Sequence, residues 1–247
     1  MFDFHSHILP GIDDGSASLE ETLALLKASR EQGVKAVVAT PHFSAEAEDP
    51  TDFLKRREES VKSLLSVYDN DTYPEVFIGA EVSYYPGISF SNEIEALRIL
   101  GTRFILIEMP FHRWTKSMID EIIQMEQRLD LIPVIAHIER YGVLRRKDIL
   151  HAFVSRGVLI QVNASFFIDK KTRKKALKML SKGEIHLIGS DMHNSDSRPQ
   201  NLKLAEDIIR EKLGDSVLKS LRSFGCEVLQ DAVPIESVLE YSLKLDF

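Results

Sequence analysis

Short apolar runs rich in β-branched residues recur along the whole chain, separated by longer stretches in which apolar residues return with a helical period. Runs that lack polar positions are typical of parallel strands buried on both faces. We predict such strands over residues 1–4, 34–40, 75–80, 103–107, 132–136, 158–162 and 185–189, with a shorter candidate over 226–229.

The stretches between these runs have the spacing of amphipathic helices. In the first stretch Leu19, Leu23 and Leu26 form one apolar stripe. Ser18 is a suitable N-cap for this helix, and Gly33 is a suitable C-terminal stop. Helices are predicted over residues 19–32, 53–68, 93–100, 118–129, 147–155, 172–180 and 202–213.

Seven strand–helix units follow one another without a repeat, a linker or a break in composition, which indicates a single domain over residues 1–247. This order favours a closed or nearly closed α/β barrel, because such a barrel collects the C-terminal ends of its strands at one mouth. An open doubly wound sheet is the alternative, but it would not bring residues from so many successive strand ends to one point.

Histidines and carboxylates stand where the apolar runs end. The first run leads into His5-Ser6-His7, and residues two apart on a strand point to the same side, so both imidazoles can bind one cation. Taken singly, a His-x-His pair could equally be two packed histidines, and a carboxylate at a strand end is more often a capping or salt-bridged residue. The later runs are followed in the same way by His42, Glu81, Glu108, His137, Asp191 and His193. Together at one mouth, they predict a polynuclear metal site.

The predicted ligands are imidazoles and carboxylates without sulfur, which suits Mn²⁺, Fe²⁺ or Zn²⁺. With Asp14 they suffice for two or three divalent ions, provided that a carboxylate bridges two of them. His151 and His186 are assigned no role, because one lies in a helical pattern and the other has the opposite strand parity to Asp191. His112 lies near the predicted mouth, and its role stays open.

The composition is that of an ordinary globular protein, with 44% hydrophobic and 28% charged residues. The net charge of −7 argues against a nucleic-acid binder that neutralises many phosphates. The single cysteine, Cys226, allows no internal disulfide, and no apolar run approaches the ~18 residues of a membrane span. We therefore expect a cytoplasmic protein without membrane insertion and without a signal peptide, since candidate ligands begin at His5. Its oligomeric state, monomer or homo-oligomer, stays open.

The candidate ligands lie within longer motifs that extend over residues 1–200. These motifs are His5-Ser6-His7, Leu9-Pro10-Gly11-Ile12-Asp13-Asp14-Gly15, Ala39-Thr40-Pro41-His42, Gly79-Ala80-Glu81, Glu108-Met109-Pro110, His137-Ile138-Glu139-Arg140-Tyr141, Gln161-Val162-Asn163-Ala164 and Ser190-Asp191-Met192-His193-Asn194. In this combination the chain resembles the bacterial protein-tyrosine phosphatases of the PHP superfamily, which act in capsule and exopolysaccharide synthesis. The stretch over residues 9–15 is specific, because PHP proteins in general do not share it. Ile138 departs from the family, where proline is expected.

The resemblance implies a distorted (β/α)7 TIM-like barrel, the PHP fold, with three metal ions that are usually manganese. The implied ligand groups are His5, His7, Glu81 and Asp191 for one ion, Glu81, Glu108 and His137 for a second, and Asp14, His42 and His193 for a third. Arg140 and Arg198 stand where the family has phosphate-binding arginines. The implied activity is hydrolysis of phosphotyrosine by metal-activated hydroxide, and the implied partner is a bacterial tyrosine kinase with a tyrosine-rich tail.

Two other functions are compatible with the same residues. One is a PHP phosphatase of a small metabolite such as histidinol phosphate, and the other is a non-catalytic module that regulates a kinase. The stretch over residues 9–15 weighs against the first, and the presence of every ligand weighs against the second. Cys226 is not part of the Cys-x5-Arg signature of cysteine-based tyrosine phosphatases.

Aromatic residues near the strand ends are candidates to flank a substrate ring, although such residues more often pack loops in place. They are Phe43, Tyr84, Tyr85, Phe111, Trp114 and Phe166. The basic run over residues 170–175 is expected to be a solvated helix start, with an attachment point for an acidic tail as the alternative.

Overall fold

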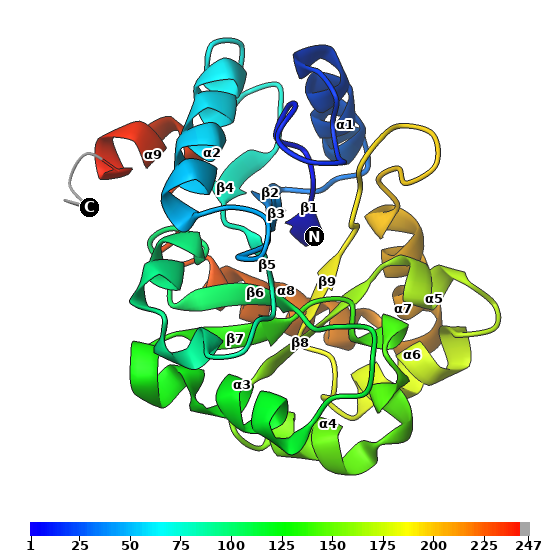
Figure 1. Cartoon of the computed structure of the whole chain (residues 1–247). Helices are drawn as coiled ribbons and strands as arrows, with labels where there is room; N and C mark the ends of the chain where they lie inside the picture. The colour runs from blue at the N-terminus through cyan, green and yellow to red at the C-terminus, as the bar shows by residue number, and fades with distance from the viewer. Residues whose placement is uncertain (243–247) are drawn as a thin grey trace.

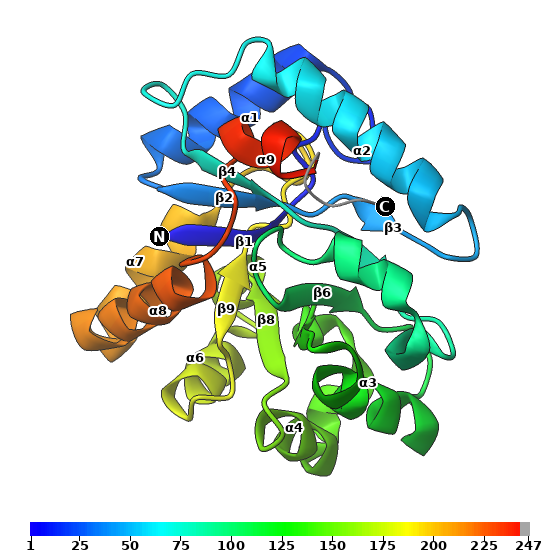
Figure 2. The same ribbon diagram turned by 90° about the vertical axis from the view of Figure 1, so that its left-hand side faces the viewer.

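Parallel strands curl around a common axis, and helices cover their outer side (Figures 1 and 2). The computed structural model describes residues 1–242. The strands are β1 (Phe2–Ser6), β2 (Ala36–Ala39), β3 (His42–Phe43), β4 (Glu75–Ile78), β5 (Glu81–Ser83), β6 (Phe104–Glu108), β7 (Ile132–Ile135), β8 (Leu159–Asn163) and β9 (Leu187–Gly189). Each of the seven principal apolar runs contains or overlaps one of these strands, as predicted.

Two of the predicted strands are interrupted and then resume, which accounts for the additional short strands β3 and β5. β2 stops before Thr40-Pro41, and β4 stops before Gly79-Ala80. Because proline has no N–H to donate to a neighbouring strand, Pro41 is a natural breakpoint. Hydrogen bonding thus divides the strands into two sheets, with the orders β1-β2-β4 and β3-β5-β6-β7-β8-β9.

The last strand returns beside the first and closes the barrel. A single parallel bridge joins Ser6 to Met192, just beyond β9. Around it, His7 N donates to Met192 O at 2.9 Å and Asp191 N donates to His5 O at 2.8 Å. The predicted seven-stranded α/β barrel is confirmed, and its distortion lies in this narrow seam and in the two interrupted strands.

The helical segments alternate with the strands. The α-helices are α1 (Leu19–Glu31), α2 (Pro50–Leu65), α3 (Lys116–Leu129), α4 (Lys147–Val154), α5 (Ser165–Ile168), α6 (Arg173–Ser181), α7 (Leu202–Leu213), α8 (Asp215–Val228) and α9 (Ile235–Ser242), and the 3-10 helices are η1 (Ile88–Phe90), η2 (Asn92–Leu97), η3 (Ile138–Arg140) and η4 (Gly142–Arg145). The predicted ends of α1 are confirmed, since Ser18 Oγ accepts a hydrogen bond from Glu21 N and Gly33 has a φ of +76°.

Two sequence predictions are wrong. Residues 226–229 are not a strand but the end of α8 and its C-cap, because Leu218, Gly225 and Val228 fall on one buried helix face. The predicted helix over residues 93–100 is the shorter 3-10 helix η2. One cause is the buried guanidinium of Arg57, which donates to Ala96 O at 3.0 Å and occupies a carbonyl at the end of this segment.

Buried clusters occupy both faces of the strands. Val37 and the outward residues of the other strands pack against the helices. Residues of opposite parity, such as Phe4 and Val38, form a smaller cluster within the barrel. Val228 and Leu229 at the end of α8 join this inner cluster and close the barrel at the N-terminal end of its strands. The opposite end is therefore the mouth that is left for polar side chains.

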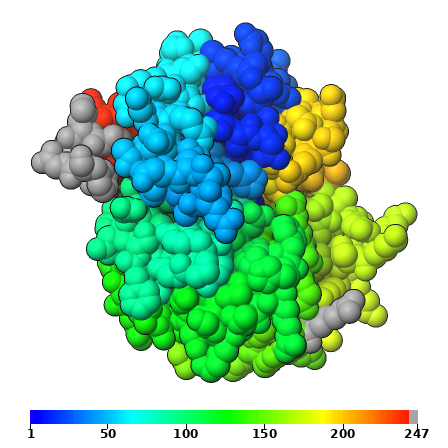
Figure 3. Space-filling model, in the orientation of Figure 1, coloured from blue at the N-terminus to red at the C-terminus, as the bar shows by residue number. Residues whose placement is uncertain are grey.

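None of the described helices is long and apolar enough to cross a membrane. Figure 3 shows one face of the molecule, on which the N-terminal segments, blue to cyan, lie directly against the central green segments. Lys170, Lys171 and Lys174 are exposed before and at the start of α6, in agreement with the predicted solvated helix start.

Candidate metal centre

A bulge in β1 turns His5 and His7 into the mouth. The pairing of β1 with β2 runs in register to Asp3 and resumes at Ser6, with a register shift between them. An extra residue in a strand reverses the alternation of its side chains. Both imidazoles are consequently buried on the inner side, with their Nε2 atoms 3.1 Å apart.

The loop after β1 folds back onto His7. Ser16 N donates to His7 O at 2.9 Å, and a Cβ on Gly15 would lie only 2.2 Å from that oxygen, so this close approach requires glycine. Asp13 Oδ2 accepts hydrogen bonds from His7 Nδ1 at 2.8 Å and from His42 N at 3.0 Å. Asp13 thereby leaves His7 Nε2 directed at the mouth, a role that sequence analysis missed although the residue lies in the specific motif.

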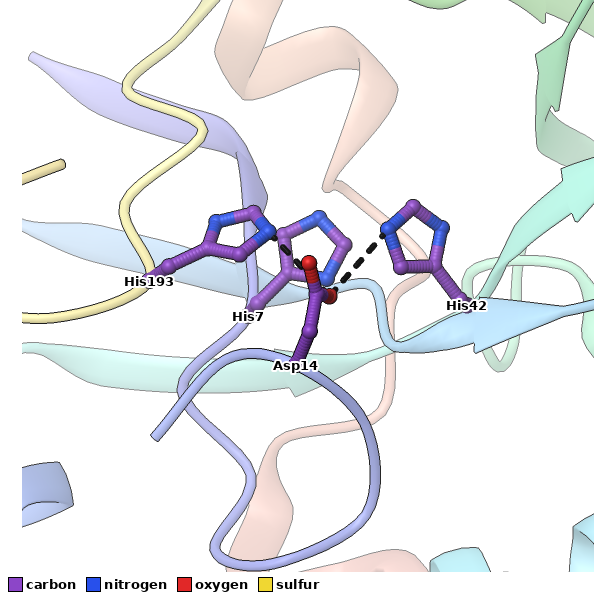
Figure 4. Close-up of side chains that lie close together, drawn as sticks. All are labelled: His7, Asp14, His42 and His193. Atoms are coloured by element: carbon purple, nitrogen blue, oxygen red, sulfur yellow. Dashed lines mark ion pairs between the residues drawn. The ribbon is translucent and has the colours of Figure 1, made fainter. Parts of the chain in front are cut away.

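Asp14 projects from the same loop between two histidines from distant parts of the chain. Its Oδ1 lies 3.5 Å from His42 Nε2 and 3.4 Å from His193 Nε2, with the ring of His7 close behind (Figure 4). The ligand atoms of these four residues all lie within 4.8 Å of one another. This group contains the predicted third set and adds His7 to it.

Glu81 is the central carboxylate of the mouth. Its Oε2 lies 3.1 Å from both His5 Nε2 and His42 Nδ1 and 3.4 Å from His7 Nε2, while Oε1 lies 2.9 Å from His137 Nε2. Its position follows from the interrupted strand, because β5 resumes at this residue after Gly79-Ala80. A carboxylate placed between several imidazoles in this way is suited to bridge two cations.

Glu108 and His137 extend the cluster from the ends of β6 and β7. His137 Nε2 lies 3.4 Å from Glu108 Oε1. The tight group that contains Glu108 is completed by Glu81 and His42 rather than by His137. The nine predicted ligands are therefore brought together, and the three tightest groups of side chains overlap the three implied ligand groups without matching them residue for residue.

His137 and Asp191 reach the cluster through unusual backbone geometry. Both are non-glycine residues with positive φ, +28° for His137 and +57° for Asp191. Such conformations cost roughly 1–3 kcal/mol and persist where the surroundings fix them. Gln161 Oε1 accepts from His137 N at 2.6 Å, and Asp191 N is held by His5 O. The strain thus falls on two predicted ligands.

Residues at the end of β8 form a polar support beneath these ligands. Gln161 Nε2 donates to Asn163 Oδ1 at 3.0 Å, and Asn163 Nδ2 donates to Asp191 Oδ2 at 2.8 Å. Asn163 N in turn donates to Glu139 Oε1 at 3.0 Å. The sequence motif contained Gln161 and Asn163 but gave them no role, although their place at a strand end was a signal for one.

Arg140 and Arg198 meet at Asp191. Arg140 contacts Asp191 Oδ2, and Arg198 Nη2 lies 2.6 Å from Asp191 Oδ1. Arg198 Nη1 also lies 2.7 Å from His193 Nε2. About a third of each arginine side chain is exposed, so both guanidinium groups face solvent at the mouth.

Charges in the cluster shift the pKa values of its carboxylates. Burial acts to raise the pKa of Glu81, but the charge of His5 and the hydrogen bond with His137 outweigh it and hold the pKa well below its usual range. Burial likewise acts to raise the pKa of Asp191, but the charge of His5 outweighs it together with the charge of Arg140, and the pKa of Asp191 is lowered. Both carboxylates are therefore anionic at neutral pH, as metal ligands must be.

The donor set fits divalent metal ions. Glu81 Oε2 is buried and accepts no hydrogen bond from any described residue, although three imidazole nitrogens lie within 3.4 Å of it. Buried polar atoms normally have a partner. Imidazole nitrogens and carboxylate oxygens whose positions converge in this way form a suitable cage for a cation.

The remaining histidines and most loop aromatics have structural roles or none. His186 packs near Phe224 of α8, and His151 is exposed on α4, as expected. Phe43, Trp114 and Phe166 are buried, and Tyr84 and Tyr85 are partly buried. Phe111 and His112 are exposed beside the mouth.

Comparison with known proteins bears on this arrangement. A sequence profile for the family described as "Capsular polysaccharide synthesis, CpsB/CapC" matches residues 1–227. The chain belongs to the CpsB/CapC family. This membership confirms the resemblance on which the ligand assignment was based.

Individual CpsB/CapC proteins match most of the chain. The tyrosine-protein phosphatase CpsB of Streptococcus pneumoniae is 32% identical over 235 residues, which cover 90% of this chain and 94% of that protein. The tyrosine-protein phosphatase CpsB of Streptococcus agalactiae is 31% identical over 225 residues, which cover 87% and 91%.

A solved CpsB/CapC structure has the same fold. It comes from work on YwqE from Bacillus subtilis and CpsB from Streptococcus pneumoniae, described as metal-dependent tyrosine phosphatases. It superposes with a TM-score of 0.80 at 24% identity, over 94% of this chain and 96% of that chain. The predicted PHP-type barrel is thereby confirmed at the level of the fold.

Proposed function

We infer that this protein is a metal-dependent tyrosine phosphatase of the CpsB/CapC family that takes part in capsular polysaccharide synthesis. The observation that carries this inference is the convergence of nine imidazole and carboxylate side chains, next to two arginines, in a chain of this family. The relatives named above are tyrosine-protein phosphatases, and the sequence match extends over almost their whole length.

The mouth would hold two or three divalent ions, with Mn²⁺ as the first choice and Fe²⁺ or Zn²⁺ as alternatives. The proposed ligands are His5, His7, Asp14, His42, Glu81, Glu108, His137, Asp191 and His193. Such ions, when bound, lower the pKa of a water ligand to about 7 and neutralise the charge of a phosphate ester. The side chains supply oxygen and nitrogen donors only, which supports the choice of Mn²⁺, Fe²⁺ or Zn²⁺.

Arg140 and Arg198 would bind the phosphoryl oxygens of the substrate. Each guanidinium presents paired N–H donors that match two oxygens of a phosphate. The contact of both groups with the carboxylate of Asp191 supports this role, because each reaches a different oxygen of one anion. In this role they would hold the equatorial oxygens in place while the ester bond breaks.

The nucleophile would be water rather than a side chain. Cys226 is exposed on α8, the helix that closes the opposite end of the barrel, and cannot attack a phosphate held at the mouth. The tyrosine leaving group has a pKa of about 10 and needs less protonation than an alkoxide. These two conditions support a direct displacement without a phospho-cysteine intermediate.

The substrate would be a phosphotyrosine-bearing protein. Within that class we propose a bacterial tyrosine kinase of the capsule or exopolysaccharide machinery, and a cytoplasmic site for the reaction. This choice of partner rests on the family resemblance, and no contact in the described residues specifies it.

A substrate comparison tests the proposal. The protein loaded with Mn²⁺ is expected to hydrolyse a phosphotyrosine peptide much faster than histidinol phosphate, and chelation should abolish both activities. Alkylation of Cys226 should leave the rate intact. Preference for histidinol phosphate would assign the protein to metabolite hydrolysis, and lack of activity with every ester despite full metal loading would favour a binding module.

A further inference from the structure

Phe111 differs from the other aromatic residues that follow strand ends. Its side chain is 67% exposed, whereas Phe43, Trp114 and Phe166 are buried. Its ring lies parallel to that of His137, at an interplanar angle of 10° and a centroid distance of 6.5 Å. It is further supported by the ring of Tyr141 at 5.4 Å. An apolar ring is thus held in place at the mouth while much of its surface stays in water.

A groove lined by Phe111 borders the metal centre at Glu108. Its volume is about 610 Å³, within the range of sites that bind small ligands. Glu108, a predicted metal ligand, lines this groove together with the loops that carry Tyr84, Tyr85 and Phe111 and with the first turns of α3. Glu121 Oε2 fixes one wall by accepting from Tyr84 Oη at 3.3 Å.

We propose that this groove binds the aromatic ring of the substrate's phosphotyrosine and that Phe111 is the specificity-determining residue that covers the ring. The proposal rests on the proposed function, because the phosphate must be held by Arg140, Arg198 and the metal centre for the ring to enter the groove.

The geometry supports an aryl ester rather than an alkyl ester. In the proposed arrangement, a phosphate held at the mouth would direct its ester substituent into the groove, because Glu108 belongs both to the predicted ligands and to the groove lining. A ring in this position can pack against Phe111, which removes apolar surface of both partners from water and adds the preference of aromatic rings for one another. The side chain of phosphoserine has no ring with which to make this contact.

Phe90 provides an internal comparison for the exposure of Phe111. It is also 67% exposed, but the guanidinium of Arg128 lies 3.8 Å from its ring centroid and covers it. Among the residues whose side chains the structure describes, no cation lies over the ring of Phe111 in this way. Phe90 lies outside the groove and serves as a matched control.

Two non-hydrolysable inhibitors isolate the contribution of the ring. Phenylphosphonate and methylphosphonate share the phosphonate and differ in the ring, so the ratio of their inhibition constants on the Mn²⁺-loaded protein measures ring binding alone. The native protein should bind phenylphosphonate at least about tenfold more tightly than methylphosphonate. In Phe111→Ala this ratio should fall close to one while methylphosphonate binds as before. Phe111→Tyr should retain the preference, and Phe111→Leu should retain only part of it.

The control variant Phe90→Ala should keep the native ratio, and metal content should be equal in all variants. An unchanged ratio in both Phe111→Ala and Phe111→Leu would overturn the proposal. Failure of the proposed function is a separate result, because it would appear in the native protein as absent hydrolysis of phosphotyrosine peptides, whatever the inhibitor ratio.

Discussion

Asp13 connects the first specific motif of the sequence to the geometry of the metal centre. Its carboxylate accepts hydrogen bonds from both His7 Nδ1 and His42 N. Asp13 therefore positions two predicted ligands without being one of them. Hydrogen-bonded carboxylates of this kind orient metal-binding imidazoles and raise their basicity. The residue therefore acts through the ligands and not on the substrate.

Asp13→Asn is expected to weaken Mn²⁺ binding by about 10- to 100-fold, the usual scale for such outer partners. Competition with a chelating dye would measure the affinity, and saturating Mn²⁺ should restore much of the rate. Asp52→Asn, an exposed carboxylate of α2, is the control and should change neither quantity. Native affinity in Asp13→Asn would show that His7 is oriented by other contacts.

His137 separates ligand function from backbone strain. Both His137→Ala and His137→Gly remove the imidazole and should lower metal content and turnover. Glycine tolerates the φ of +28° that alanine does not, so the glycine variant should be more stable by about 1 kcal/mol in the presence of a chelator. Urea unfolding of the two metal-free variants makes the comparison, and equal midpoints would mean that the site stores no strain here.

Arg140 and Arg198 are expected to affect the rate rather than the metals. Arg198→Ala and Arg140→Ala should each lower phosphotyrosine hydrolysis by roughly 10²-fold or more, the effect of removing a preorganised charge-stabilising donor. Lysine should rescue only in part, because it lacks the paired donors of arginine. Steady-state kinetics and phosphate inhibition would be measured beside Arg146→Ala, whose exposed side chain pairs with Asp148. Native rates in both variants would show that neither arginine takes part in phosphotyrosine hydrolysis.

At the scale of elements, the seam between β1 and β9 depends on the absence of a side chain at Gly189. A Cβ there would lie 2.4 Å from His5 Cβ and 2.8 Å from Gln161 Nε2. Both neighbours belong to the cluster or its support, so any adjustment at Gly189 would be transmitted to the metal centre.

Gly189→Ala is therefore expected to destabilise the fold by roughly 1–3 kcal/mol, as overpacking does, and to lower metal content at the same time. Gly142→Ala is the matched control, because a Cβ at Gly142 would meet no atom within 4 Å. Denaturant unfolding and elemental analysis would be compared in both variants. Native stability in Gly189→Ala would show that the seam can relax without cost.

The sequence predicted those elements whose pattern is local. Apolar runs marked the seven strands, and polar residues after the runs marked the mouth, because a strand end needs only a few neighbouring positions to be recognised. The bulge in β1 and the breaks before His42 and Glu81 were not predicted, since they arise from pairing with other strands. α8 was missed because a short apolar run within an amphipathic helix resembles a strand.

The site shows the same limit. Ligands could be predicted from residue type and position, with the family resemblance supplying Asp14 and the two arginines with their roles. Asp13 and Gln161 could not be assigned, because a supporting residue is defined by the atom it contacts and not by its own chemistry. The grouping of ligands also depends on distances that spacing along the chain does not contain.

At the scale of the whole molecule, metal binding and folding should be coupled. The predicted ligands come from nearly every strand end, and a metal that binds only the folded chain stabilises it. The Mn²⁺-loaded protein is expected to unfold at a higher temperature than the chelated protein. At a free Mn²⁺ concentration one hundred times the dissociation constant, one bound ion should add about 2.7 kcal/mol to the free energy of unfolding. Calorimetry with and without chelator tests this, with His151→Ala as a variant that should respond as the native protein does.

An unchanged transition after complete metal removal would mean that the mouth is held in its shape by protein contacts alone. Ser190 Oγ, after β9, donates a hydrogen bond to Asp3 Oδ2 in β1, although the two residues are 187 positions apart. We therefore expect the barrel to close in part without metal. The measured difference therefore reports how much the ions add to that closure.

The narrow seam between β1 and β9 also has a consequence for synthesis of the protein in the cell. His5 and His7 are made before the other predicted ligands, whereas Asp191 and His193, which lie across the seam from them, are made last among those ligands. A nascent chain that has not yet reached these residues holds an incomplete set of ligands. Activity should consequently arise late and in one step, and no shorter intermediate of translation would dephosphorylate a partner prematurely.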